Sequence, residues 1–383
     1  MARVVRVLPD VPAIDKEFDY VVPPAIEADV RVGTVVRVEL HGRRVGGWVV
    51  ADDVSPIEGV ALRPLAKVTG WGPADALIEL ARWSAWRWAG RPATFLKAAS
   101  APGAVRALPA PARSLPRGGG NESWPARSVL RLPPTADRVS FVLDAASRGP
   151  CLVLAPSVSD VERLAARLRR AGARVAVLPR DWALATAGAD VVVGARAGAW
   201  GPCHDLATGV VLDAHDEAYQ DERAPTWNAW QVVAERCRRA DVPCRLVSPC
   251  PTLDQLAWAG EPVTPERAEE YAGWPTVEVA DRRSDDPRLG LMSEPLTRLL
   301  RGEGRVVCVL NRKGRARLLA CTTCGVVVAC ERCGSAVEQV GEGTAAALRC
   351  RRCQTVRPVV CQSCGGGRMK NLRPGVARLA EEL

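Results

Sequence analysis

The distribution of apolar and polar positions divides the chain into segments with different predicted structures. Residues 1–66 alternate apolar and polar positions between turn signals, as in VVRVLPDVP and FDYVVPP, which predicts a small β domain. Residues 67–104 carry apolar positions at helical spacing and predict a compact helical unit. Residues 105–127 are rich in Pro, Gly, Ala and Arg, which is typical of a linker. Across residues 128–285, short buried-strand patterns alternate with helical stretches, which predicts a parallel sheet covered by helices on both faces.

The rest of the chain contains a helix–strand pattern in residues 286–318, a cysteine-rich segment in residues 319–368, and a helical pattern in residues 369–383. No apolar run reaches the roughly 18 residues that span a bilayer. Aspartates interrupt the first twenty residues, unlike a signal peptide. We therefore expect a multidomain α/β protein of the cytoplasm.

Eight of the fourteen cysteines form four C-x-x-C pairs, which are Cys321/Cys324, Cys330/Cys333, Cys350/Cys353 and Cys361/Cys364. Two intervening residues let a tight turn present both sulfurs to one ion, and tetrahedral zinc takes four ligands. Gly325, Gly334 and Gly365 follow three of the pairs, where such a turn needs positive φ. We predict two structural Zn(II) ions, with iron–sulfur ligation as the less favoured alternative. Spacing alone leaves open which pairs share an ion.

The net charge of +9 is concentrated around these cysteines. From Asn311 to Arg378 there are 13 Arg and Lys residues and 3 Glu, a net of +10. Two four-thiolate zinc centres, each formally −2, would still leave a positive module suited to a polyanion. Arg349, Arg351 and Arg352 flank the third cysteine pair. They fit either a solvated surface or phosphate contacts, and the basic setting favours phosphate.

The passage LNRKGRARLLACTTCG, continuing to CQSCGGGRMK, resembles the start of the second motor lobe and the cysteine-rich insertion of the PriA family of replication-restart helicases. FDYVVPP resembles that family's 3′-DNA-end-binding domain, here residues 1–66. VLAPS, GARAGAW, LDAHDEAYQ and SPCPT resemble successive motifs of its RecA-like first lobe, here residues 128–285. The resemblance implies nested zinc sites, with Cys321, Cys324, Cys361 and Cys364 at one ion and Cys330, Cys333, Cys350 and Cys353 at the other.

In that family, a pocket built on the FDY motif holds the 3′ terminus of a leading strand at a replication fork. The residues that match it are Phe18, Asp19 and Tyr20, with Gly33 and Lys67 completing the pocket. The chemistry is suitable, because a ring can stack on the terminal base, a carboxylate can accept from the sugar hydroxyl, and glycine admits the backbone closely. Without the resemblance, the alternation fits Phe18 and Tyr20 as core residues.

Two further groups are candidates for DNA contacts. Arg43 and Arg44 follow a predicted turn at His41–Gly42, and a DNA-facing hairpin and a solvated turn fit them equally. Trp83 and Trp86 share one helix face. We interpret this stripe as the core of a winged-helix-like domain over residues 67–104, in preference to a base-stacking surface.

The motor motifs are degenerate. The family's phosphate loop GVTGSGKT aligns with RLPPTADR, in which Pro133 and Pro134 have no N–H to donate. Asp137 stands at the lysine position and Arg138 at the magnesium-binding hydroxyl. The DEEH box becomes LDAH, where Asp213 could serve as a ligand only after a one-residue slip. These changes predict a lobe that serves as scaffold, without ATPase or helicase activity.

The resulting hypothesis is a replication-restart protein that binds stalled or branched fork DNA at the leading-strand 3′ end. The resemblance implies that it helps to reassemble the primosome and reload the replicative helicase. Its expected partners are single-stranded-DNA-binding protein and helicase-loading proteins, and we expect a monomer associated with the nucleoid and with no membrane. One alternative is an active ATP-dependent 3′-to-5′ DNA helicase with an unusual nucleotide site. A second is a generic zinc-ribbon nucleic-acid binder unrelated to restart.

Overall fold

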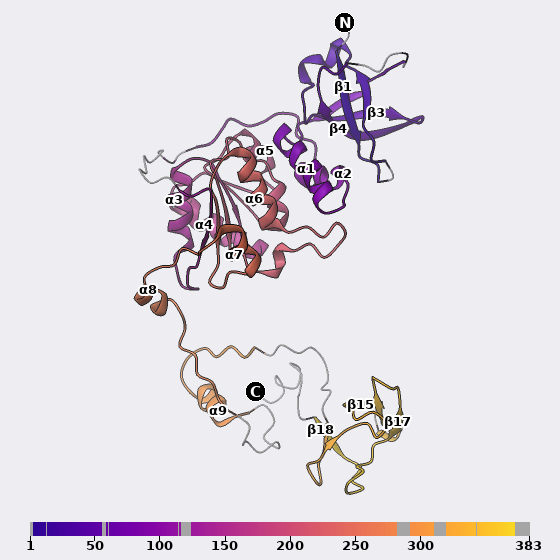
Figure 1. Ribbon diagram of the computed structural model, residues 1–383, viewed down its shortest axis with the longest axis vertical. Helices are drawn as coiled ribbons and strands as arrows, with labels where there is room; N and C mark the ends of the chain where they lie inside the picture. The colour runs from indigo at the N-terminus through magenta and orange to yellow at the C-terminus, as the bar shows by residue number, and fades with distance from the viewer. Residues whose placement is uncertain are drawn as a thin grey trace. The chain divides into compact units, whose positions relative to one another are not determined.

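The computed structural model describes residues 3–12, 14–55, 59, 61–113, 115, 124–281, 292–309, 319–341 and 343–371. The chain forms two compact units, Met1–Pro275 and Thr276–Leu383 (Figure 1). Most of the second half of the expected linker and the expected terminal helix lie outside the described residues. Residues 305–309, where the strand before the cysteines was expected, are described and form no strand, so that prediction is wrong for these residues. Among the described residues, no helix is both long enough and apolar enough to cross a membrane.

The first unit begins with a six-stranded sheet in the order β5-β2-β1-β4-β3-β6. Its strands are β1 (Val4–Pro9), β2 (Phe18–Val21), β3 (Val35–Leu40), β4 (Arg43–Ala51), β5 (Arg63–Pro64) and β6 (Lys67–Gly70), with a 3-10 helix η1 (Pro24–Asp29) after β2. All neighbours are antiparallel except β2 and β5. In β3, Val36 and Val38 are buried while Arg37 and Glu39 are exposed, so the predicted alternation places one face against the core.

Two helices follow, α1 (Asp75–Arg87) and α2 (Pro92–Ala99), and they share one core with the next domain. Phe95 packs on Trp200 with ring centroids 4.9 Å apart, and Trp182 Nε1 donates to the Ala99 carbonyl at 2.9 Å. Trp83 packs edge-on against Trp88. Trp86 is 78% exposed, so its predicted place in the core is wrong. The winged-helix assignment stays a prediction.

The second domain of this unit contains a parallel sheet in the order β7-β12-β11-β8-β10-β9, which confirms the prediction of a parallel α/β segment. Its strands are β7 (Arg127–Leu130), β8 (Cys151–Leu154), β9 (Val175–Val177), β10 (Val191–Gly194), β11 (Thr208–Leu212) and β12 (Cys244–Val247). Its helices are α3 (Arg138–Ser147), α4 (Val158–Arg170), α5 (Trp182–Ala187), α6 (Ala229–Ala240), α7 (Leu253–Ala259) and α8 (Arg267–Ala272), with 3-10 turns η2 (Arg196–Trp200) and η3 (Glu217–Tyr219).

Helices cover both faces of this sheet (Figure 1). Val191 and Val193 of β10 pack into the core under α3 and α4, whereas Val192 packs into the core that contains α6 and α1. Successive strand residues point to opposite faces, so a continuous apolar run is needed for a sheet buried on both sides. That this parallel-sheet domain is a RecA-like lobe stays a prediction.

The second unit contains α9 (Glu294–Arg301) and two three-stranded sheets, in the orders β14-β13-β18 and β15-β16-β17. Their strands are β13 (Leu319–Cys321), β14 (Val327–Val328), β15 (Val337–Val340), β16 (Ala347–Cys350), β17 (Val356–Pro358) and β18 (Met369–Asn371), with a 3-10 turn η5 (Gly343–Ala345). The buried core of these sheets is small, formed by Leu319, Val328, Val337 and Leu348 beside Cys330 and Cys350. A fold with so little apolar core requires a further constraint.

The packing around Trp200 generates a stability prediction. Trp200 has no exposed surface and contacts both Phe95 and Trp227. Trp200→Ala should lower the free energy of unfolding by about 3–5 kcal/mol, because it leaves a cavity where two domains share a core. Trp86→Ala is the matched control and should change it by less than about 0.5 kcal/mol. Urea unfolding followed by circular dichroism measures both, and equal effects would contradict the shared core.

Candidate metal centres and DNA-end cavity

The four C-x-x-C turns bring their sulfurs into two groups of four. The Sγ atoms of Cys321, Cys324, Cys361 and Cys364 all lie within 4.8 Å of one another, as do those of Cys330, Cys333, Cys350 and Cys353. These are the two sets that the family resemblance implied. Cys321 and Cys364 Sγ are 3.5 Å apart, and Cys330 and Cys353 Sγ are 3.4 Å apart. Four zinc–sulfur bonds of about 2.3 Å place tetrahedral sulfurs roughly 3.8 Å apart, so each group fits that ion.

All four turns have the same backbone geometry. In each, the residue after the second cysteine donates its N–H to the carbonyl of the first, at 2.8–3.0 Å. That residue has positive φ in every case, with 74° at Gly325, 69° at Gly334, 61° at Gln354 and 73° at Gly365. Three of these are the glycines predicted from the sequence. Gln354 was missed because it is not a glycine, although its position in the turn is equivalent.

The crowded thiols of each group shift one another's pKa values in opposite directions. Backbone N–H groups of Cys324 and Thr323 lower the pKa of Cys321 to about 6. The Gly366 N–H also lowers the pKa of Cys364, but hydrogen bonds shared with Cys324 and Cys321 raise it to about 12. The second group also contains one lowered and one raised pKa. Thr355 lowers the pKa of Cys353 to about 6. The Cys353 N–H lowers the pKa of Cys350, but burial and hydrogen bonds with Cys333 and Cys353 raise it to about 11. A divalent cation would remove this competition for protons, and four sulfur ligands leave no open position for catalysis.

Two of the arginines near the third cysteine pair are already paired. Glu338 accepts from Arg349 Nη2 at 2.7 Å and from Arg351 Nε at 2.5 Å. Both arginines lower the pKa of this carboxyl, Arg349 most. Arg352 has no acidic partner among the described residues. The three arginines therefore differ, although the sequence presented them as one group.

The FDY motif lies at a cavity of about 590 Å³ on the β domain. Phe18, Asp19 and Tyr20 all line it. The register of β1 and β2 sets Arg6 opposite Asp19, and the Arg6 guanidinium donates to both Asp19 oxygens at 2.7 and 3.2 Å. The Tyr20 hydroxyl donates to the Glu39 carbonyl at 3.2 Å, and burial raises its pKa. Tyr20 is therefore held in place as part of the cavity wall, and within the FDY motif Asp19 and Phe18 are the groups that can contact a ligand.

The other predicted pocket residues do not line this cavity. Gly33 has φ 91°, and a Cβ there would lie 1.9 Å from the Pro73 carbonyl oxygen, so packing alone requires glycine. Lys67 is exposed in β6, opposite Arg37. Arg43 and Arg44 are exposed after the predicted turn, where His41 and Gly42 have positive φ; this exposure fits a DNA-facing hairpin and a solvated turn equally.

Sequence reasoning missed three basic residues that line the cavity, Arg6, Lys16 and Arg63. Arg6 could have been found by pairing the first two predicted strands, because Asp19 occupies the facing position in an antiparallel register. Arg63 lies on β5, whose parallel pairing with β2 has no signal in the local sequence.

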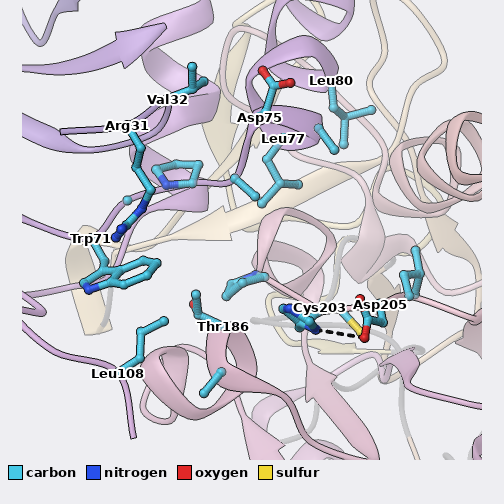
Figure 2. A pocket seen from close by; sticks show the side chains of 18 of the residues that line it. Arg31, Val32, Trp71, Asp75, Leu77, Leu80, Leu108, Thr186, Cys203 and Asp205 are labelled. Atoms are coloured by element: carbon cyan, nitrogen blue, oxygen red, sulfur yellow. Dashed lines mark ion pairs between the residues drawn. The ribbon is translucent and has the colours of Figure 1, made fainter. Parts of the chain in front are cut away.

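A larger cavity, of about 1110 Å³, lies within the first unit between the β domain, α1 and the parallel-sheet domain (Figure 2). On one side the Arg31 guanidinium stacks on Trp71, 3.0 Å from the ring centroid, and burial lowers its pKa. Leu77 and Leu80 of α1 form part of the wall, and Cys203 lines the side contributed by the parallel-sheet domain. Side chains thus only partly fill the space between these domains of the first unit.

Side chains at the junction of α3 and the loop after β7 form hydrogen bonds to that loop and to the first turn of α3. The Asp137 carboxylate caps α3, accepting from the N–H groups of Val139 at 3.0 Å and Ser140 at 3.4 Å. The Ser140 hydroxyl, at 2.6 Å, and then the Val139 N–H lower the pKa of Asp137. The Arg138 guanidinium donates to the Pro133 and Ala136 carbonyls, both at 3.1 Å, and lies 3.8 Å from Asp213.

The cysteine turns generate a second prediction. A non-glycine residue with positive φ costs about 1 kcal/mol, so Gln354→Gly should stabilise the zinc-loaded module by about 0.5–1 kcal/mol. Gly365→Ala is the converse control, because no atom lies within 4 Å of the added Cβ and only the backbone conformation is penalised. Zinc release to a competing chelator measures both variants. Faster release from Gln354→Gly would contradict the account.

Comparisons with known proteins agree with this arrangement. The model of the PriA 3′ DNA-binding domain family matches residues 6–101. The chain is 27% identical to a probable replication restart protein PriA of Mycobacterium tuberculosis, over 97% of this chain and 65% of the relative. It is 29% identical to the replication restart protein PriA of Thermotoga maritima, over 63% of this chain and 35% of the relative, and 26% identical to that of Bacillus subtilis, over 61% and 31%. The chain thus spans slightly less than two thirds of the mycobacterial relative's length, and along nearly all of its own length it is similar to replication restart proteins named PriA.

Proposed function

We propose that this protein recognises branched replication-fork DNA through a leading-strand 3′ end, and supports primosome reassembly without hydrolysing ATP. The observation that carries the proposal is the cavity in which Phe18 and a nearly buried Asp19 carboxylate lie together on the domain that matches the 3′ DNA-binding family. The relatives' names supply the process, replication restart.

The cavity has the groups that a DNA end requires. Each Asp19 oxygen bonded to Arg6 retains a lone pair that can accept from a sugar hydroxyl. A terminal phosphate there would instead place negative charge against the carboxylate. Phe18 offers a face to the terminal base, and Lys16 lines the cavity where it can contact backbone phosphates, whereas Arg63 is already paired with Glu39. This combination favours a free 3′-hydroxyl end.

The loop before α3 supports the proposal that ATP is not hydrolysed. A helix N-terminus binds phosphate through its free N–H groups, and here Asp137 accepts from two of them. Arg138 occupies the loop as a donor to carbonyls, where a magnesium site needs an oxygen ligand. A carboxylate at the phosphate position repels the nucleotide that an active motor must bind. The parallel-sheet domain would then act as a scaffold for the DNA-end domain.

The two four-sulfur groups are proposed to hold Zn(II) as structural ions. Zinc suits soft tetrahedral sulfur sites, and its role here would be to hold together a module with a small apolar core. The expected partners are fork DNA, single-stranded-DNA-binding protein, and primosome and helicase-loading proteins. We propose that the chain acts as a monomer.

The end-recognition proposal is tested with matched forks that carry a free or phosphate-blocked leading-strand 3′ end. Wild type should prefer the free end by about 10- to 100-fold, the range expected for a hydrogen bond to a charged group. Asp19→Ala should abolish this preference. Asp10→Ala is the control, because it removes a carboxylate outside the cavity. Equal binding of both forks by wild type would instead favour a generic zinc-ribbon nucleic-acid binder.

The nucleotide proposal is tested by thermal unfolding and hydrolysis assays with Mg-ATP. Millimolar Mg-ATP should leave the melting temperature unchanged, because a ligand stabilises only the state that binds it. Fork DNA should not stimulate phosphate release. Asp137→Ala should lower stability by about 1 kcal/mol through loss of the helix cap, without creating hydrolysis. Fork-stimulated hydrolysis by wild type would favour the active-helicase alternative.

A further inference from the structure

The charge of the described cysteine module is close to balanced once metal is considered. Between Leu319 and Asn371 there are seven Arg and Lys residues and three Glu. Two four-thiolate Zn(II) centres, each formally −2, would cancel the remaining +4. Net charge of this stretch therefore does not explain attraction to a polyanion. The local arrangement of its guanidinium groups decides what it can bind.

Three arginines of this stretch have partners within the module. Glu338 holds Arg349 and Arg351. Arg357 donates to the Val360 carbonyl at 2.7 Å. Arg332 and Arg352 are exposed, and their guanidinium groups form neither an ion pair nor a hydrogen bond with any described residue. Within the cysteine turns, these two are therefore available to an external anion; Arg368, also exposed, lies outside the turns.

Arg332 and Arg352 occupy equivalent positions around one metal centre. Each directly precedes the second cysteine of its turn, and both turns contribute to the Cys330, Cys333, Cys350 and Cys353 group. The turns share their backbone geometry, with the closing N–H donating to the first cysteine carbonyl at 2.8 and 2.9 Å. Their sulfurs meet at 3.4 and 3.5 Å. Two equivalent turns beside the same site thus carry guanidinium groups that have no partner among the residues the structure describes.

The other centre provides an internal comparison. Its equivalent positions are Thr323 and Ser363, which are neutral. The same fold therefore holds four sulfurs without arginines at these positions, so the turn itself does not require them. Their presence at only one centre calls for a role other than folding.

We propose that Arg332 and Arg352 form a phosphate-binding pair that holds the DNA backbone against the second metal centre. A guanidinium donates two parallel hydrogen bonds to a phosphate, and two of them can hold separate phosphates of one strand. Residues 319–371 contain no aromatic side chain on which a base could stack, so the contact is independent of sequence. The inference rests on the proposed binding of fork DNA, but it does not depend on the 3′-end cavity.

The test compares two double variants of the full zinc-loaded chain. Arg332→Ala/Arg352→Ala should weaken fork binding by about tenfold at low salt. It should also reduce the slope of log affinity against log salt by about 1.4–1.8, because each lost phosphate contact removes about 0.7–0.9. Arg349→Ala/Arg351→Ala is the matched control and should keep nearly the wild-type slope, since Glu338 already holds both side chains. Arg332→Lys/Arg352→Lys should keep most of the slope, because it retains the charge.

Zinc content and end preference distinguish phosphate binding by this pair from a structural role and from a role in the 3′-end cavity. Zinc content should remain at the wild-type value in Arg332→Ala/Arg352→Ala, and loss of zinc would overturn the proposal by showing that these arginines serve the thiolates. A wild-type salt slope in this variant would also overturn it. The ratio of affinities for free and blocked 3′ ends should not change. The preference for the free 3′ end should disappear in Asp19→Ala and not in the arginine variant. The salt slope therefore tests the arginine pair, the end preference tests the cavity, and the two proposals can fail separately.

Discussion

In the parallel-sheet domain, the chain itself satisfies the N-terminus of α3. An uncapped helix start presents free N–H groups and partial positive charge, which in a phosphate loop attract the nucleotide. Here Asp137 supplies the anion, and Arg138 ties the preceding loop to its own carbonyls. The N-terminus of α3 is therefore satisfied by the chain's own side chain. The sheet keeps both of its buried faces, so the fold does not require a ligand at this position.

The β domain and the two helices that follow it are attached to the parallel-sheet domain through a shared core. Helices α1 and α2 share a core with the parallel-sheet domain, and the Trp182 indole donates across to the Ala99 carbonyl. Trp48 of the β domain donates to Ser100 at 2.8 Å, which links the strand domain to the end of α2. A cavity on a rigid scaffold can position one strand end without a motor cycle. The proposed function is consistent with that division of roles.

Much of this organisation could be predicted from local sequence. The alternation in β3, the apolar run of β10 and the four C-x-x-C pairs each indicate a structure within a few residues. Contacts between distant segments could not be predicted in this way. Arg6 meets Asp19 only because of the β1–β2 register, and Glu338 meets Arg349 and Arg351 only through the pairing of β15 with β16.

The sequence also does not reveal structurally equivalent positions when they carry different residue types. Gln354 adopts the positive φ of the glycines that follow the other cysteine pairs, because the turn geometry imposes it. Trp86 shares a helix face with Trp83 by spacing, yet it is exposed, because the surrounding domains cover only part of α1. In both cases tertiary geometry overrides the local pattern.

The most direct test of the central claim is the affinity for a fork with a free leading-strand 3′ end, titrated with and without Mg-ATP. The account predicts the same dissociation constant in both conditions, with the preference over a blocked end retained. A fork affinity that changes with Mg-ATP would contradict it, because nucleotide binding would then be coupled to DNA recognition.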